Sequence, residues 1–263
     1  MDDLVWDGRG IGHLSATYVA REDGIAFDDV RLTGGAHDGT GAIRCAIAIT
    51  NCRASFALES SDAQATLEDF GFRPDVSASK ASFSGDFEWE PGTDKPWLAS
   101  ARGRLSLKLA DGTTRGTDVD ERSSFALLAV PALVNGMASS GNEGTSALKF
   151  ARLEADFDLQ DGEASTSDLH FDGDAEILMR GRTGLLARDY DQRVWILKGE
   201  ERLPAPVRRF GPSPRVAAAW LTLREMFAGT NDVRARATLR LAGSWDEPKV
   251  VAAETGQAGS QDR

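Results

Sequence analysis

The chain has 263 residues, of which 41% are hydrophobic and 27% are charged, a composition that supports a large folded core and excludes wholesale disorder. Its formal net charge of -11 disfavours nucleic acid as a partner, because an acidic surface repels phosphates. The sequence contains no apolar run of about 18 residues, and the acidic start at Asp2 and Asp3 is unlike a signal peptide, so we expect neither a membrane-spanning helix nor a signal peptide.

The main pattern along the chain is the alternation of apolar and polar residues, which predicts antiparallel strands covered on one face. The alternating segments are 44–49, 82–89, 104–109, 153–159 and 238–241. Asp and Gly tolerate positive φ angles, so Asp-Gly pairs favour hairpin turns, and such pairs lie at 23–24, 161–162 and 172–173. We expect roughly 12 to 14 strands in all.

Three segments break the alternation and are predicted to be short helices. The first covers 61–70, with Ser61 or Asp62 as its N-cap. The second covers 123–137 and contains Pro131, which would kink or split it. The third covers 214–227, and its apolar stripe consists of Val216, Trp220, Leu223 and Phe227.

The two cysteines, Cys45 and Cys52, leave two possibilities open. They can form a disulfide in an oxidising compartment, or they can remain two buried thiols. In a tight hairpin that turns at Thr50 and Asn51, their odd separation places them on opposite faces unless a bulge intervenes. This argument favours the two thiols.

Residue patterns for catalysis or metal binding do not occur in the sequence. The histidines His13, His37 and His170 lie in no metal-binding motif, and neither a phosphate loop nor a nucleophile elbow is present. Asp156 and Asp158 share one face of a predicted strand, which a solvent-exposed face explains better than a cation site. We therefore expect no metal, no cofactor and no enzymatic activity. An envelope hydrolase or metal-dependent enzyme that uses these carboxylates is the less favoured alternative.

Three motifs in a fixed order carry a resemblance to a known family. Residues 85–92 read GDFEWEPG, residues 181–194 read GRTGLLARDYDQRV, and residues 243–248 read GSWDEP. This set resembles the C-terminal region of the YhdP branch of AsmA-like bacterial envelope proteins. The residues that carry the family motifs are Arg188, Asp189, Tyr190, Asp191, Gln192, Gly243, Trp245, Asp246 and Pro248.

The resemblance implies a mainly β fold, in which a long curved antiparallel sheet forms a U-shaped groove with about three short helices. Residues 1–75 would form a groove segment with a short helix, residues 76–252 the C-terminal groove region, and residues 253–263 a flexible tail. Family members resemble bridge-like lipid-transfer proteins. The implied function is the distal segment of a periplasmic protein that moves phospholipid between the inner and outer membranes.

The same resemblance implies an inner-membrane anchor that precedes this region in the full-length protein, and an outer-membrane or periplasmic protein partner. The alternative is a scaffold for outer-membrane biogenesis that carries no lipid. Co-purified phospholipid would distinguish the two functions.

The apolar face of the predicted sheet would line the lipid groove, because a one-sided sheet with few helices leaves apolar surface uncovered. The predicted lining residues are Ile47, Ile49, Phe83, Phe87, Trp89, Leu105, Leu107, Leu109, Leu153, Phe157, Leu159, Val194, Ile196, Leu239 and Leu241. The predicted helix residues that would close the groove end are Phe125, Leu128, Leu133, Val216, Trp220, Leu223 and Phe227. The other possibility is that the alternating residues face each other in a closed sandwich or barrel core.

Overall fold

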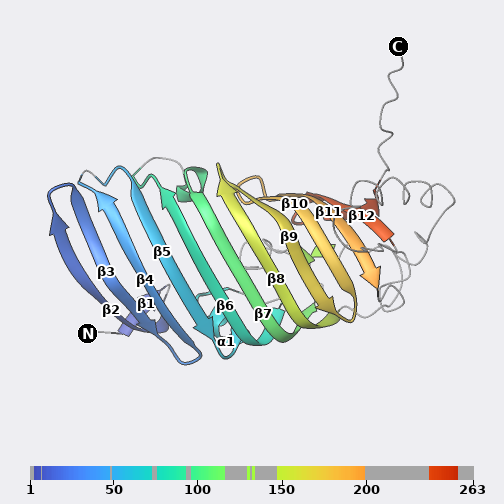
Figure 1. Cartoon of the computed structure of the whole chain (residues 1–263), viewed down its shortest axis with the longest axis horizontal. Helices are drawn as coiled ribbons and strands as arrows, with labels where there is room; N and C mark the ends of the chain where they lie inside the picture. The colour runs from blue at the N-terminus through green and yellow to red at the C-terminus, as the bar shows by residue number, and fades with distance from the viewer. Residues whose placement is uncertain are drawn as a thin grey trace, which may run out of the picture.

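The described residues form a single antiparallel sheet of 13 strands, which follow the order of the sequence (Figure 1). The computed structural model describes residues 3–6, 8–47, 49–72, 76–92, 96–115, 129–130, 132–133, 147–198 and 237–253. The strands are β1 (Asp3–Trp6), β2 (Arg9–Arg21), β3 (Gly24–Thr33), β4 (His37–Ala46), β5 (Cys52–Ser60), β6 (Val76–Trp89), β7 (Arg102–Arg115), β8 (Ala147–Gln160), β9 (Glu163–Gly173), β10 (Glu176–Gly184), β11 (Asp189–Lys198), β12 (Ala237–Ser244) and β13 (Lys249–Ala252). The predicted antiparallel fold and strand number are confirmed.

One α-helix is described in full, so the prediction of three is not confirmed, although Val130, Ala132 and Leu133 in the second predicted segment are also helical. The helix α1 (Ala63–Asp69) lies inside the first predicted segment, and a 3-10 turn, η1 (Trp97–Ala99), lies between β6 and β7. Most of segment 123–137 and all of segment 214–227 lie outside the described residues.

The capping of α1 follows from its sequence. The Asp62 side chain accepts a hydrogen bond from the backbone N–H of Ala65 at 3.1 Å, as an N-cap residue does, so Asp62 rather than Ser61 caps the helix. After Phe70, Gly71 adopts a φ of 86°, which an L side chain rarely adopts. The helix buries Ala63 and Leu67 against the sheet.

Of the three predicted Asp-Gly turns, one forms at the predicted pair, one forms one residue earlier, and one does not form. Asp161 and Gly162 have φ angles of 51° and 80° and connect β8 to β9 in a two-residue turn, which is the geometry of a type I′ hairpin. Residues 22–23 connect β2 to β3, so this turn lies one residue before the predicted pair, and Gly24 is the first residue of β3. The pair at 172–173 is the end of β9 instead, because the chain reverses two residues later.

One face of the sheet is apolar. Residues that pair directly opposite each other across neighbouring strands point to the same side, so apolar residues at paired positions gather on one face. In one such row, Phe56 pairs with Gly85, and Gly85 pairs with Leu105. A Cβ atom at Gly85 would lie 2.6 Å from the Phe56 ring and 2.7 Å from Leu105. Large side chains of neighbouring strands therefore cover Gly85.

The opposite face is polar and carries ion pairs between neighbouring strands. Arg53 pairs with Asp86 at 2.7 Å, and Arg104 pairs with Asp158 at 3.5 Å. All four side chains are more than half exposed, so each pair contributes at most about 1 kcal/mol to folding. Asp156 is also exposed on this face, as a solvated strand face requires.

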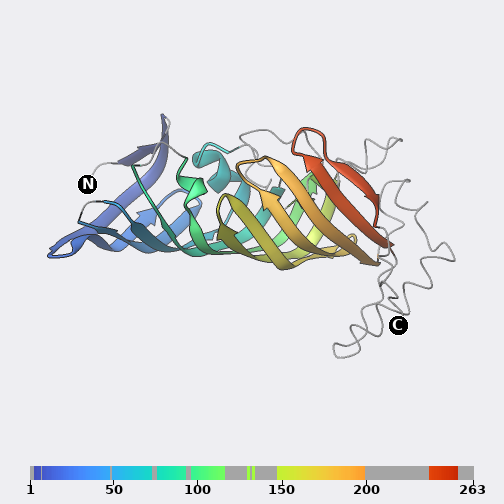
Figure 2. The ribbon, with the colours of Figure 1, turned by 90° about the horizontal axis from the view of Figure 1, so that it is seen from above.

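The sheet curves around its apolar face, from an open trough at β2–β5 to a tightly curled end at β10–β13 (Figure 2). At the curled end the apolar face is a closed core, in which Leu153, Phe171, Ile177, Val194 and Leu239 are fully buried. The pairing of β5 with β6 carries the sheet without interruption past residue 75, and the division into segments 1–75 and 76–252 stays a prediction. Within the described ranges, no helix has the length and apolarity needed to cross a membrane.

Candidate lipid-binding groove

The apolar face divides into two parts that differ in exposure. We call the apolar face of β2–β6 the open half and that of β7–β12 the closed half. In the open half, Tyr18 is 61% exposed, Leu14 and Phe27 are exposed, and Phe56 is half-buried. In the closed half, the large apolar side chains are almost completely buried.

Two rims bound the open half, because neighbouring strands reverse at opposite ends. The helix rim consists of residues 34–36 and 61–72, which include α1. Among the described residues, the turn rim consists of 22–23, 47, 49–51, 90–92 and 96–101, which include η1. Figure 1 shows α1 and the short green turn of η1 at opposite ends of the strands.

The predicted lining residues fall in both halves. Phe83, Phe87 and Trp89 lie partly buried in the open half, and Leu105, on β7 at the boundary, is also partly buried. The predicted residues that lie buried in the closed half are Leu107, Leu109, Leu153, Phe157, Leu159, Val194, Ile196, Leu239 and Leu241. The sheet therefore has a part in which the predicted lining residues are partly exposed and a part in which they form a closed core.

The placement of Ile47 and Ile49 on a strand is wrong. Strand β4 ends at Ala46, and both isoleucines lie in the turn that leads to β5, where Ile49 has a φ of 52°. The alternation of apolar and polar residues in the sequence continues into this turn, but the pairing of β4 with β5 ends before it, at Cys45 and Cys52. The two side chains consequently lie on the turn rim.

Part of the chain between β7 and β8 lies within the closed half. Ala129, Val130, Ala132 and Leu133 are at most 1% exposed and belong to the same apolar cluster as the strands of the closed half. Leu133 is thus buried, as a groove-closing residue would be. The other predicted groove-end residues lie outside the described residues: Phe125, Leu128, Val216, Trp220, Leu223 and Phe227.

Sequence reasoning missed several residues of the open half. Phe56 and Leu58 alternate with polar or small residues in β5, so this pattern was available. Tyr18 and Phe27 face each other across β2 and β3, but each of these strands changes register at a bulge. A bulge breaks the period of two, which hides the apolar face from a pattern search.

Aromatic rings connect the turn rim to the floor of the open half. The Phe87 ring centroid lies 6.3 Å from that of Phe56, 5.4 Å from that of Trp89 and 6.0 Å from that of Trp97. Trp97 belongs to η1 and is 50% exposed. The cluster therefore runs from solvent at the rim to the centre of the groove.

The cysteines form a disulfide between β4 and β5, and the argument that favoured two thiols is wrong. Cys45 pairs directly opposite Cys52 in the ladder, and directly opposite residues point to the same face whatever their separation along the chain. The bond joins the two strands next to the β4–β5 turn, at the turn rim.

The two C-terminal family motifs lie side by side on β11 and β12. Arg182 donates two hydrogen bonds to the Asp189 carboxylate, at 2.9 and 3.1 Å, and lies 3.5 Å from Glu163. Hydrogen bonding from Arg182 lowers the pKa of Asp189, and burial opposes this effect. Arg240 donates a hydrogen bond of 3.0 Å to Asp191, which raises the pKa of Arg240.

Trp245 holds the second motif against the first. Its backbone N–H donates to the carbonyl of Arg188 at 2.8 Å, the Arg188 guanidinium lies 5.6 Å from the indole centroid, and the ring of buried Tyr190 lies 6.2 Å away. Gln192 donates to Thr183 at 3.2 Å, and Gly243 pairs with Tyr190. Asp246 and Pro248 follow in the turn to β13. In this arrangement the motifs fix the turns at the end of β10–β13.

The fold and this groove define a class of protein: a one-sided β-sheet that curves around an apolar groove. The chain belongs to the YhdP protein family, whose model matches residues 1–250. This family comprises AsmA-like envelope proteins associated with lipid transport. No curated protein and no solved structure matches the chain.

In the part of the chain that the structure describes, no three His, Cys, Asp or Glu residues lie together as a metal site would require.

Proposed function

We propose that the open half binds the acyl chains of phospholipid. The chain would then form the distal segment of a periplasmic protein that moves phospholipid between the inner and outer membranes. One observation carries this proposal: the apolar side chains are buried over β7–β12, whereas over β2–β6 Leu14, Tyr18 and Phe27 are exposed and Phe56 and Phe83 are only partly buried. Exposed apolar side chains that gather on one face mark a binding site.

The energetics require no catalytic group. An acyl chain of about 16 carbons gains about 13 kcal/mol on leaving water, at about 0.8 kcal/mol for each buried CH₂ group. An acyl chain that lies across the strands of the open half would contact the apolar side chains of Tyr18, Phe27, Phe56 and Phe83. A lipid can therefore bind by burial alone.

The disulfide supports the proposed location. Structural disulfides persist in oxidising compartments such as the bacterial periplasm, and Cys45 and Cys52 are positioned by the ladder itself. The inner-membrane anchor and the outer-membrane or periplasmic partner belong to the proposal and rest on family membership.

Native mass spectrometry of the detergent-free chain, with lipid extraction alongside, tests the function. We expect phospholipid at defined stoichiometry, and we expect its loss in the variant Tyr18→Glu/Phe27→Glu, which places two carboxylates in the open half. The matched control is Thr17→Glu/Thr40→Glu, which adds the same charge to the polar face of the same region and should retain the lipid.

Two outcomes would contradict the proposal. A folded wild-type chain that carries no lipid after expression and after incubation with phospholipid vesicles would favour the scaffold function instead. Equal lipid loss in the two double variants would show that the lipid does not bind the open half.

A further inference from the structure

We propose that acyl chains enter the open half sideways across the turn rim, between the β4–β5 turn and η1. This inference rests on the proposed function and adds the route by which the ligand reaches its site. We call the stretch of the turn rim that carries the exposed side chains of Ile47, Ile49 and Trp97 the portal.

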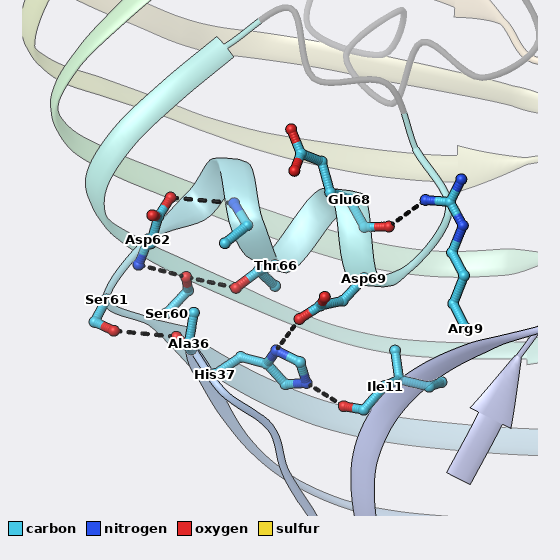
Figure 3. Close-up of polar contacts among 11 residues, drawn as sticks. Arg9, Ile11, Ala36, His37, Ser60, Ser61, Asp62, Thr66, Glu68 and Asp69 are labelled. Carbon is cyan, nitrogen blue, oxygen red and sulfur yellow. Dashed lines mark hydrogen bonds and ion pairs between the residues drawn. The ribbon is translucent and has the colours of Figure 1, made fainter.

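The helix rim is blocked by α1, which contacts both β6 and β2 (Figure 3). At its start, the backbone N–H of Ser61 donates to Ala36 of the β3–β4 turn at 2.9 Å. Also near its start, Ser60 at the end of β5 shares a hydrogen bond of 2.8 Å with Thr66. These contacts fix the helix to the strand ends that it covers.

At its other end, α1 is fastened to the first part of β2. Arg9 donates to the carbonyl of Glu68 at 2.6 Å. The ring of His37, whose side chain is fully buried, donates through Nε2 to the carbonyl of Ile11 at 2.9 Å and places Nδ1 3.8 Å from the Asp69 carboxylate (Figure 3). The helix therefore closes this rim from β6 to β2.

The turn rim has no comparable cover among the described residues. Ile47 is 73% exposed and Ile49 is 50% exposed, although both are β-branched apolar side chains. Cys52 pairs with Trp89, so the β4–β5 turn lies next to the connection that carries Trp97. Exposed apolar side chains thus flank one short stretch of the rim.

The portal continues into the groove without a polar interruption. The Trp97 ring contacts Phe87, and Phe87 contacts Phe56 at the centre of the open half. This continuity identifies the occupant as the acyl chain that the groove itself would bind. A broad anionic membrane surface fits poorly, because the exposed carboxylates of Glu88 and Glu90 lie beside the portal.

Photo-crosslinking tests the route. A photoreactive phenylalanine analogue is placed at Ile47, at Trp97, at Phe83 on the groove floor, and at Phe72 on the helix rim. Phe72 is the matched control, since it is 42% exposed and apolar but lies just after α1. The protein is mixed with vesicles of phosphatidylethanolamine and irradiated early in loading, and crosslinked phospholipid is counted by mass spectrometry. We expect crosslinks at Ile47, Trp97 and Phe83, and a several-fold lower yield at Phe72.

The outcomes separate this inference from the proposed function. Crosslinks at Phe83 without crosslinks at Ile47 and Trp97, or an equal yield at Phe72, would overturn the portal and leave the groove in place. An absence of crosslinks at all four positions would overturn both.

A rate measurement on conventional variants provides a second test. The variant Ile47→Ser/Trp97→Ser should load lipid several-fold more slowly than wild type, whereas Phe72→Ser should load at the wild-type rate. Equal loading rates in the two variants would contradict the portal.

Discussion

Removing the disulfide should destabilise the protein by an amount that its position in the ladder determines. Cys45 and Cys52 are separated by 7 residues along the chain, so the bond closes a short loop. The loss of chain entropy in the unfolded state for a loop of this length corresponds to about 2.4 kcal/mol at 25 °C. We expect Cys45→Ala/Cys52→Ala to lower the free energy of unfolding by this amount and Tm by about 5–8 °C.

Thermal unfolding followed by circular dichroism, with and without reductant, is the assay. Wild type in reductant should unfold at the temperature of the double variant, and the variant itself should not respond to reductant. A variant whose Tm lies within about 1 °C of oxidised wild type would refute the reasoning. The β4–β5 turn would then be held by its ladder and by the hydrogen bond from Ile47 to Asp23.

Three further predictions follow from the packing and the ion pairs. Gly85→Ala should cost about 1–3 kcal/mol in urea unfolding, because its Cβ would collide with two side chains, whereas Gly10→Ala, with open space around it, should stay within about 0.5 kcal/mol of wild type. Phe157→Asp places a charge at a position that is 1% exposed and should abolish cooperative unfolding, so a folded variant would contradict the closed core. Asp189→Asn should cost about 1 kcal/mol at pH 7, since it removes the partner of Arg182 at a site that is one-third exposed. The pKa of Asp189 is lowered in the folded state, so this contribution is present above the unfolded pKa of about 3.9 and disappears as pH falls through the folded pKa. The unfolding curves of wild type and Asp189→Asn should therefore converge at low pH. A difference in stability that stays constant with pH would argue against the ion pair.

Strands with strict alternation were predictable from the sequence. In β8, Leu153, Phe157 and Leu159 all point to the apolar face, as their spacing requires. The same strand also shows where the rule fails, because Leu148 and Phe150 are buried on the same side as Leu153 despite the odd spacing between 150 and 153. The face changes between these residues, and a sequence pattern does not reveal such a change.

The difference between the open and closed halves was not predictable from local pattern. Phe83 and Phe157 alternate with polar neighbours in the same way, yet one is partly exposed and the other is buried. Their difference depends on how strongly the sheet curves at each point and on which segments fold back over it, such as residues 129–130, 132–133 and α1. Both the curvature and the covering segments depend on tertiary contacts between residues that are far apart in the sequence. The disulfide depended in the same way on register, which the separation of the cysteines does not determine.

The central claim is that lipid occupies the apolar face over β2–β6, and crosslinking inside cells at two neighbouring residues of β6 tests it most directly. Phe83 points into the open half, whereas Ser84 points to the polar face one residue later. With a photoreactive residue at each position in turn, we predict crosslinked phospholipid from Phe83 and none from Ser84. Equal yields at the two positions, or no phospholipid from Phe83 in a folded protein, would contradict the account.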